Sequence, residues 1–509
     1  MYHRGMLNLR PITFLAASLT ALAAIPEPVH VEQGQITGVD GATAEVRIFK
    51  GVPFAAPPVG DLRWRAPKPA ANWEGVRAAD KFSPTCMQRA GNSSRPAGED
   101  CLYLNVYTAA KTAKEHRPVM VWIHGGALTG GAGSIYDGEA LAKKGVVVVT
   151  VNYRLGVFGF FAHPELTKES DRNASGNYGL LDQVAALEWV QKNITAFGGD
   201  PKRVTIFGES AGSWSVNYLM ASPLARGLFH RVIGESGGEF APARKLADLE
   251  QAGTKLAAGS SIAALRAKSA DDVQKMGGFQ TAANVDGWFL PQDVYTIFST
   301  GKQSDVPLLI GSNSDEGTMF TPPGVKLATF RETAGKRYGA EADAFLKIYP
   351  ANTDEEAWDA QAASMRDQVF GWEMRTWARM QTKTGKSKVY MYYFSRVPPG
   401  KNRVKGAYHG SEIAYVFGNL KIAPFAGSSD EPRPWQEQDH KLSEAMSSYW
   451  VNFATTGDPN GKGLPKWPAY HAKDDVLMGF GDTIEVKPVP NKPALDFLDA
   501  YFEKQRQTQ

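Results

Sequence analysis

The chain has 509 residues, of which 43% are hydrophobic and 21% are charged, a composition that supports a large apolar core and excludes a disordered chain. The 56 basic residues nearly balance the 53 acidic ones and leave a net charge of +3, so charge does not indicate a nucleic acid or an anionic membrane as a partner. No repeat, low-complexity tract or Pro/Ser-rich linker divides the chain. We therefore expect one large domain with long insertions over residues 24–509.

The first 23 residues have the pattern of a secretory signal peptide. Arg4 and Arg10 precede the apolar run 12–25, which is too short to span a bilayer, and Ala-Leu-Ala at 21–23 fits a cleavage site. A buried core helix is the alternative. No other stretch approaches the roughly 18 uninterrupted apolar residues of a membrane-spanning helix. The pattern favours a secreted or periplasmic protein without stable membrane insertion.

The chain has two cysteines, Cys86 and Cys101. An exported chain meets an oxidising environment, which favours a disulfide between them over two free buried thiols. Closing a loop of about 15 residues is worth about 3 kcal/mol in the chain-entropy model. The two cysteines lack the C-x-x-C pairing and the nearby histidines of zinc sites, so we predict no metal site and expect no cofactor.

A glycine-rich loop at 124–131 follows a strand predicted over 118–123. Backbone N–H groups on such a loop can donate to a carbonyl oxygen as it becomes negative during acyl transfer. Glycine-rich loops are commonly simple turns, and it is the position between an apolar strand and a later serine motif that favours a catalytic role. His124 precedes that serine motif, so we predict that it orients the loop and is not the base.

The serine motif is the G-x-S-x-G pattern at 208–212, centred on Ser210. β-Branched and aromatic residues precede it, and the segment 211–222 has no proline and has apolar residues at helical spacing. A serine hydroxyl is a poor nucleophile and must project from a sharp turn toward a base, which a strand–turn–helix elbow achieves. The sequence therefore predicts Ser210 as the nucleophile of an acyl-transfer reaction.

The same pattern occurs a second time at 234–238, around Ser236. Paired glycines and then Pro242 follow this serine, and they favour irregular backbone over an immediate helix. We predict that Ser236 is not the nucleophile. It is expected to pack near the same sheet edge or to support a catalytic side chain there.

A serine nucleophile needs a base, and in this architecture the acid and then the histidine follow the serine in the chain. Four of the nine histidines do so: His230, His409, His440 and His471. His230 comes too soon after the elbow, His440 falls in a helix predicted over 438–454, and His471 follows a proline-rich turn. His409 lies in a glycine-flanked loop after a strand-like segment, where such sheets place catalytic residues. We predict His409 as the base.

The acid is expected in the loop 311–317, which follows the short apolar segment 306–310. This loop carries two adjacent carboxylates, Asp315 and Glu316. Either can orient the imidazole and stabilise its cation, so the chemistry alone leaves both open.

Together with these motifs, further segments resemble the type-B carboxylesterases of the carboxylesterase/cholinesterase family. They are FKGVPFAAPPVG at 49–60, GEDCLYLN at 98–105, VNYRLG at 151–156, NYGLLDQ at 177–183, HGSE at 409–412 and WVNFATTGDPN at 450–460. The resemblance implies the α/β-hydrolase fold, an α/β architecture with a central, mostly parallel sheet flanked by helices. Long insertions would form the walls of an active-site gorge. The compact length with one expected disulfide is most similar to exported bacterial members.

The resemblance also implies roles for individual residues. It favours Glu316 over Asp315 as the acid. It places the oxyanion donors at three backbone N–H groups, those of Gly126, Ala127 and Ala211. It puts Glu209 beside the site.

Two further features concern the scaffold and the substrate. The resemblance implies the Cys86–Cys101 bridge and two structural ion pairs, Arg63 with Glu99 and Arg154 with Asp182. Cholinesterases carry a tryptophan in the first disulfide loop that binds a quaternary ammonium by cation–π attraction. The loop closed by Cys101 has no aromatic residue, so choline esters are not expected substrates.

The resulting hypothesis is a serine hydrolase that cleaves small-molecule carboxylic esters through an acyl-enzyme. A serine amidase or peptidase with the same triad is one alternative, and a non-catalytic adhesion or scaffold protein is another, because a fold does not determine a function. The sequence leaves the natural ester and the oligomeric state open, with a monomer as the plausible state.

Overall fold

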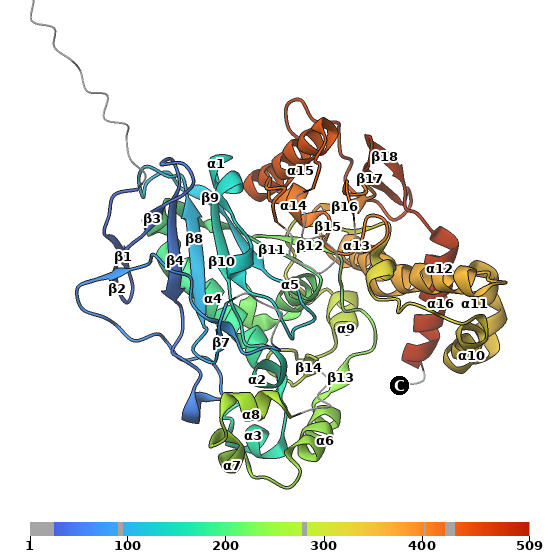
Figure 1. The fold of residues 1–509 in the computed structure, drawn as a ribbon, viewed down its shortest axis with the longest axis horizontal. Coiled ribbons are helices and arrows are strands. Elements are labelled where there is room, and N and C mark those ends of the chain that lie inside the picture. Colours follow the sequence, from blue (N-terminus) through green and yellow to red (C-terminus); the bar gives the residue numbers. More distant parts are fainter. Residues whose placement is uncertain (1–24, 90–94, 277–281, 402–403, 423–432, 508–509) are drawn as a thin grey trace, which may run out of the picture.

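The computed structural model describes residues 25–89, 95–276, 282–401, 404–422 and 433–507. The signal peptide predicted at 1–23 lies outside these ranges. The dominant feature is an 11-stranded sheet with the strand order β18-β17-β16-β15-β12-β11-β9-β10-β8-β4-β3 (Figure 1). Pairs from β10 to β17 are parallel, and the pairs at both edges are antiparallel. The predicted α/β-hydrolase architecture is confirmed.

The strands of the large sheet are β3 (Val39–Asp40), β4 (Arg47–Pro53), β8 (Tyr103–Thr108), β9 (Arg117–Ile123), β10 (Val147–Val151), β11 (Gly199–Glu209), β12 (Arg231–Glu235), β15 (Leu308–Asn313), β16 (Val389–Phe394), β17 (Val476–Phe480) and β18 (Ile484–Pro488). Smaller sheets contain β1 (Val29–Val31), β2 (Gly34–Thr37) and β5 (Val76–Ala78), then β6 (Thr85–Cys86) with β7 (Ala97–Gly98), and β13 (Arg244–Lys245) with β14 (Asn284–Val285).

The α-helices are α1 (Glu139–Lys143), α2 (Gly156–Phe160), α3 (Pro164–Glu169), α4 (Tyr178–Asn193), α5 (Ala211–Ala221), α6 (Leu246–Ala257), α7 (Ile262–Arg266), α8 (Ala270–Gln274), α9 (Val294–Ser299), α10 (Leu327–Tyr338), α11 (Ala342–Ile348), α12 (Asp354–Met365), α13 (Trp372–Thr384), α14 (Ile413–Val416), α15 (Glu437–Thr456) and α16 (Lys492–Gln507). A π-helical turn, Arg366–Gly371, joins α12 to α13. In the described ranges no helix is long and apolar enough to cross a membrane.

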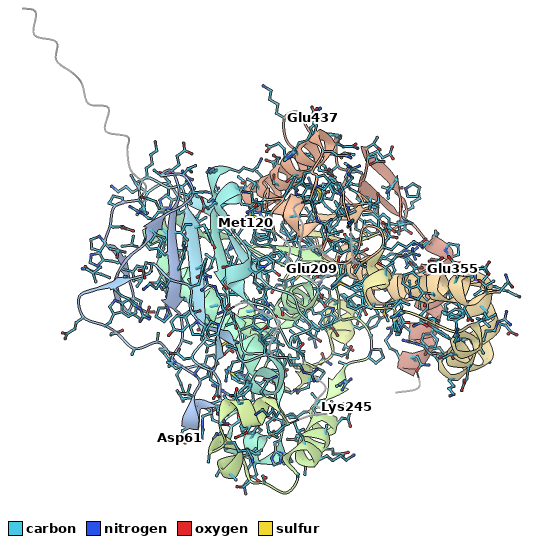
Figure 2. The ribbon with its side chains drawn as sticks, in the orientation of Figure 1. Asp61, Met120, Glu209, Lys245, Glu355 and Glu437 are labelled. Atoms are coloured by element: carbon cyan, nitrogen blue, oxygen red, sulfur yellow. A yellow bond between two sulfur atoms is a disulfide. The ribbon has the colours of Figure 1, made fainter. Side chains whose placement is uncertain are left out.

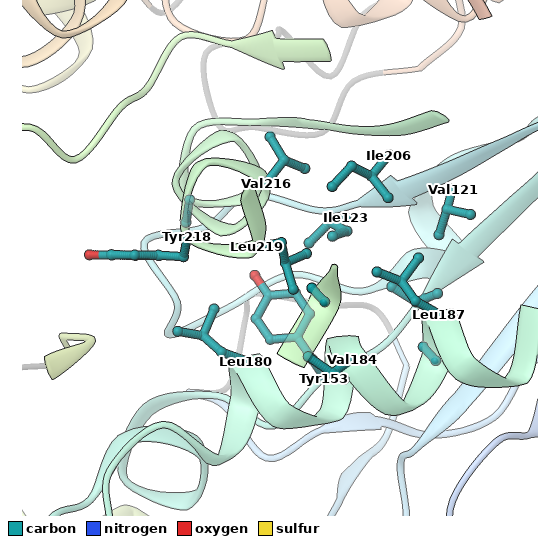
Figure 3. Packing of buried hydrophobic residues seen from close by; sticks show 14 of the residues in the cluster. Val121, Ile123, Tyr153, Leu180, Val184, Leu187, Ile206, Val216, Tyr218 and Leu219 are labelled. Carbon is teal, nitrogen blue, oxygen red and sulfur yellow. The ribbon is translucent and has the colours of Figure 1, made fainter. Parts of the chain in front are cut away.

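The central strands are buried because helices cover both faces of the sheet. All five residues of β10, with the sequence VVVTV, are buried, as expected for a parallel strand between two helical layers. On one face, α4 and α5 pack against β9 and β11 through aliphatic side chains such as Leu187, Leu219 and Ile206 (Figure 3). On the other face, α15 packs in an aromatic cluster that includes Trp122 and Trp450.

The strand register brings the carboxyl ends of neighbouring parallel strands to one edge. Glu209 pairs with Glu235, and Glu235 pairs in turn with Gly311. On the other side of β11, Gly208 pairs with Ile123 of β9. The residues that follow these strands therefore start from one edge, which is where open α/β sheets place their active sites. The two serine motifs are side by side although 26 positions separate them in the sequence.

The two insertions, at roughly 240–300 and 320–385, fold as mainly helical layers that meet where Phe298 of α9 packs on Trp377 of α13. The first contains α6 to α9, and the second contains α10 to α13. In Figure 1, α10, α11, α12 and α16 gather at one end of the molecule. Phe345 of α11 packs there against Tyr338 and Phe497, in a third apolar cluster. The sequence analysis did not predict these layers.

The covalent and ionic scaffold agrees with the expectations. Cys86 and Cys101 form a disulfide. Arg63 lies 2.6 Å from Glu99, and the buried Arg154 forms an ion pair of 2.7 Å with Asp182. The strand expected over 306–310 begins two residues later and extends to Asn313, because its pairing with β16 continues to Phe394.

Candidate active site

Ser210 lies at a sharp turn between β11 and α5, with φ 57° and ψ −123°. This positive φ is rare for a residue with a side chain and marks a strained turn. A Cβ atom on Gly208 would lie 2.5 Å from the carbonyl oxygen of Ile123, and one on Gly212 would overlap the same oxygen. Both positions therefore require glycine because the turn packs directly on β9. The predicted elbow is confirmed.

His409 and Glu316 are joined at this edge of the sheet. His409 Nδ1 lies 2.5 Å from Glu316 Oε2, and the two side chains are 2% and 0% exposed. The second oxygen, Glu316 Oε1, accepts the Asn313 N–H at 2.7 Å and the Ser236 hydroxyl at 2.5 Å. Three donors therefore hold the carboxylate in one orientation, with one oxygen directed at the imidazole.

Asp315, the neighbouring carboxylate, has different contacts. Its Oδ2 accepts the Ala407 N–H at 2.9 Å and the Ser314 hydroxyl at 2.5 Å. The Asp315 N–H also donates to the Ala407 carbonyl at 3.1 Å, so the two bonds with Ala407 fasten the loop that carries His409 to the loop 311–317. The structure therefore places the Glu316 carboxylate, and not that of Asp315, against the imidazole of His409.

Ser236 repeats the backbone geometry of Ser210, with φ 57°. Its N–H donates to the carbonyl of Gly311 at 2.8 Å, and its hydroxyl is bonded to Glu316. The described residues that follow it directly, 237–243, form no helix, as the sequence analysis expected. A Cβ atom on the next residue, Gly237, would lie 2.8 Å from the carbonyl oxygen of Ser210. The second serine thus supports the acid and lies next to the first.

The glycine-rich loop after β9 lies directly beside Ser210. A Cβ atom on Gly125 would be 3.0 Å from Ser210 Cβ and 2.7 Å from the carbonyl oxygen of Glu209. Gly126 and Ala127 both have positive φ, 104° and 54°. The N–H groups of Thr129 and Gly130 close the loop onto the Gly126 carbonyl. This turn begins at Gly125, which lies next to the predicted nucleophile.

His124 stabilises the start of this loop. Its ring stacks on Tyr153 with centroids 4.5 Å apart, and its Nδ1 lies 2.8 Å from the Gly125 carbonyl. Tyr153 donates its hydroxyl to the His124 carbonyl at 2.8 Å. Burial lowers the pKa of His124 to about 4, so the ring is neutral near pH 7. These contacts fit the loop-orienting role expected from the sequence.

Glu209 lies between the elbow and His409, near the middle of the molecule (Figure 2). Its Oε1 is 3.1 Å from His409 Nε2, and its side chain is fully buried. Burial, reinforced by the charges of Glu412, Glu316 and Glu235, raises the pKa of Glu209 well above its ordinary value. This carboxyl borders the site, as the resemblance implied, and its surroundings favour its neutral form.

The other late histidines lie elsewhere. His440 is exposed on α15, and His471 is exposed at the start of the turn that precedes β17. His230 accepts the Val204 N–H at 3.3 Å where β12 begins. These positions agree with the surface and packing roles expected of His440 and His230.

Several side chains at this site were missed by the sequence analysis. The rings of Phe320 and Phe370 pack on His409, with centroids 5.0 and 4.8 Å from the imidazole. Phe370 comes from the π-helical turn, which no local pattern in the sequence indicated. Two buried glutamates, Glu235 and Glu412, lie behind the site and influence the same carboxyl groups. The sequence did contain a signal for both glutamates, because Glu235 lies in the serine pattern at 234–238 and Glu412 in the HGSE segment at 409–412.

A cavity of about 90 Å³ lies away from these residues, between α3, the start of α4 and the segment after β14. Aromatic side chains that include Trp64, Tyr178 and Trp288 line it. Across the residues that the structure describes, no group of three or more His, Cys, Asp or Glu side chains is arranged to hold a metal ion.

Comparison with known proteins gives consistent matches along the chain. The family model described as "Carboxylesterase family" matches residues 26–498. The fumonisin B1 esterase of Sphingopyxis macrogoltabida is 39% identical, over 93% of this chain and 91% of that protein. Liver carboxylesterase 1F of Rattus norvegicus is 36% identical, over 89% of this chain and 90% of that protein. A solved PNB esterase superposes with a TM-score of 0.79 at 34% identity, over 92% of this chain and 99% of that one.

Proposed function

Since this chain belongs to the carboxylesterase family and is a serine hydrolase of carboxylic esters, we propose that Ser210, His409 and Glu316 carry out the cleavage. The observation that supports this assignment best is the short bond between His409 Nδ1 and Glu316 Oε2, 2.5 Å long and buried, at the edge where Ser210 leaves β11 on a strained turn. A carboxylate in that position holds the imidazole in one tautomer and stabilises its cation.

In the acylation step, the Ser210 oxygen attacks the ester carbonyl while His409 Nε2 takes the hydroxyl proton. The carbonyl oxygen becomes negative, and we assign its stabilisation to the N–H groups of Gly126, Ala127 and Ala211. The proximity of the glycine-rich loop to Ser210 supports this assignment. Ala127 keeps the N–H that a glycine would supply there, because the methyl group does not replace it.

The tetrahedral intermediate collapses when His409 returns the proton to the alcohol oxygen, which leaves as the free alcohol. The acyl group remains on Ser210. A water molecule then attacks this acyl-enzyme with His409 again as base, and the carboxylic acid leaves. Each proton taken by the imidazole is returned within the same half-reaction, so the enzyme ends as it began.

The assignment is tested by labelling and by kinetics on paired substrates. A fluorophosphonate should label Ser210, and a peptide map should locate the adduct there. Hydrolysis of an aryl ester against the matched anilide separates the esterase from an amidase or peptidase. Absence of labelling in the folded protein would support a non-catalytic adhesion or scaffold role instead.

We also propose that residues 1–23 direct export to a secreted or periplasmic location and that 24–509 form a single hydrolase domain. The basic and apolar pattern of the first residues and the Cys86–Cys101 disulfide support export. N-terminal sequencing of the exported protein tests the cleavage position. Gel filtration with light scattering tests the proposed monomer.

The substrate is a small-molecule ester. Fumonisin B1 is a reasonable first ester to assay, because the Sphingopyxis relative that covers 93% of this chain carries that name. A series of aryl and alkyl esters with graded acyl and alcohol size would then define the pocket. The predicted exclusion of choline esters belongs in the same assay.

A further inference from the structure

Glu235 is the last residue of β12 and immediately precedes Ser236, whose hydroxyl is bonded to Glu316. The Glu235 side chain is fully buried. Its Oε1 accepts the indole N–H of Trp450 at 2.7 Å. Its Oε2 is buried and has no hydrogen-bond partner in the described part of the chain. A buried oxygen in that position is costly when it is charged and can act as a donor when it is protonated.

The groups around Glu235 are almost all acidic. The charge of Glu235 raises the pKa of four neighbours: Glu209 on β11, Tyr392 on β16, Glu412 in the segment after His409, and Tyr136. Glu316, in the loop after β15, acts in the same direction on Glu209, Tyr392 and Glu412. His409 is the basic side chain of the cluster. In the ranges that the structure describes, no lysine or arginine forms an ion pair or hydrogen bond with Glu209, Glu235, Glu316 or Glu412.

Four buried carboxyl groups beside one imidazole cannot all be ionised, because each additional buried charge repels the others and loses its hydration. Glu316 is the member with three donors, so it is the best place for a negative charge. Glu412 Oε1 and the Tyr392 hydroxyl are also buried without a partner among the described residues. A proton on Glu235 Oε2 provides a donor for such oxygens, directly or through a buried water.

We propose that Glu235 is a positioning residue of the esterase and that its neutral carboxyl is the form that supports rapid hydrolysis. A neutral Glu235 leaves the negative charge of the cluster on Glu316, opposite the imidazole that becomes a cation in the reaction. An ionised Glu235 would repel the carboxylate of Glu316. This repulsion would displace the end of β12 and with it Ser236, whose hydroxyl is bonded to Glu316. The proposal rests on the roles given above to Ser210, His409 and Glu316.

The electrostatics of the site agree with this proposal. Burial raises the pKa of Glu235 to about 8, although the hydrogen bond from Trp450 acts in the opposite direction. The carboxyl therefore holds its proton near pH 7 and loses it as the pH rises through about 8. Glu412 is subject to the same influence, since burial and the charges of Glu316 and Glu235 raise its pKa well above the ordinary value.

The test is the pH profile of kcat from about pH 6 to about pH 10, measured with an alkyl ester whose own ionisation does not change. The wild-type kcat should fall on the alkaline side with an apparent pKa of about 8. Glu235→Gln keeps a neutral, similar side chain, so it should remain active and lose this alkaline fall. Trp450→Phe removes a bond that favours the anion, so the fall should move upward by about one pH unit.

Glu373→Gln is the matched control. Glu373 is also buried, and its pKa is raised to about 8, but its carboxylate accepts the backbone N–H groups of Phe240 and Ala241. Its replacement should leave the alkaline fall in place. Infrared spectra near neutral pH should also show the loss of one protonated carboxyl band in Glu235→Gln, whether or not that variant is active.

The outcomes separate this proposal from the triad assignment. An alkaline fall that persists unchanged in Glu235→Gln, or that disappears in Glu373→Gln, overturns the role of Glu235 and leaves the triad intact. Retained activity in His409→Ala overturns the triad itself. If Glu235→Gln is poorly folded, the pH profile of kcat for Trp450→Phe tests the proposal instead. An alkaline fall in kcat at the same pH as in the wild type then contradicts the proposal.

Discussion

Ser236 donates its hydroxyl to Glu316 over 2.5 Å, so the serine that repeats the G-x-S-x-G motif is bonded to the carboxylate proposed as the acid. The two serines therefore predict different kinetic losses. Ser210→Ala removes the nucleophile and should reduce kcat by about a millionfold, since the members of a triad act as a unit. Ser236→Ala removes one donor to a charged group and should cost about tenfold.

Steady-state ester hydrolysis and organophosphate labelling check this pair, with circular dichroism as the control for folding. Ser210→Ala should be neither active nor labelled, and Ser236→Ala should be both. Labelling that survives in Ser210→Ala and is lost in Ser236→Ala would reverse the assignment.

Replacement of the two carboxylates in the loop 311–317, Glu316 and Asp315, should also give different losses in kcat. Glu316→Gln removes the charge that faces His409 Nδ1 and favours the wrong tautomer, for which a loss of about ten thousandfold is expected. Asp315→Asn only weakens the bond to the Ala407 N–H, so the loss should be about tenfold. Measurement of kcat for the two variants tests this prediction. A large loss in Asp315→Asn together with full activity in Glu316→Gln would contradict the assignment of Glu316 as the acid.

Gly125→Ala tests how tightly the glycine-rich loop packs on the nucleophile. The new methyl group would lie 3.0 Å from Ser210 Cβ and 2.8 Å from Glu209 Oε2, so either the loop or the serine must move. A displacement of this kind should lower kcat by about a hundredfold. The control is Gly335→Ala in α10, where a Cβ atom meets nothing within 4 Å. That variant should keep full activity and gain about 0.5–1 kcal/mol of stability.

Loss of the disulfide between Cys86 and Cys101 should lower stability without a large effect on catalysis. Replacing Cys86 and Cys101 by serine opens a short loop and should lower the free energy of unfolding by about 3 kcal/mol. The kcat should change little, because the contacts of His409 and Glu316 come from other segments. Non-reducing mass spectrometry of the exported protein should find one intramolecular bridge. Two alkylatable thiols without reduction would be the contrary result.

The buried carboxyl group of Glu373 should make the free energy of unfolding depend on pH. Burial, followed by the charge of Glu239, raises the pKa of Glu373 to about 8, whereas an unfolded glutamate titrates near about 4.3. Between these values the folded state holds a proton that the unfolded state has lost, so the stabilising contribution falls as the pH rises. Denaturant titrations at several pH values should show a shallower decline for Glu373→Gln than for the wild type. Identical declines would contradict the raised pKa.

The sequence by itself determined the catalytic motifs because their geometry is local. A strand, a tight turn and a helix are encoded within the 203–222 segment, whereas the close packing of Gly208 and Gly212 on Ile123 of β9 comes from the folded sheet. The order of serine, acid and histidine then left four histidines, and the loop position of His409 after a strand-like segment made it the predicted base. The choice of Glu316 over Asp315 needed the family resemblance, since adjacent carboxylates are chemically alike.

Only the tertiary structure decided which distant side chains share the site. Glu235, Glu412 and Phe370 belong to three different segments. Nothing in the short-range pattern indicates that Phe370 packs on His409 or that Glu235 and Glu412 are close enough to interact. The strand register of the sheet places Glu235 beside Glu209, and burial then changes the proton affinity of both carboxyls. Such shifts depend on desolvation and on charges from several segments at once, which exist only when the chain is folded.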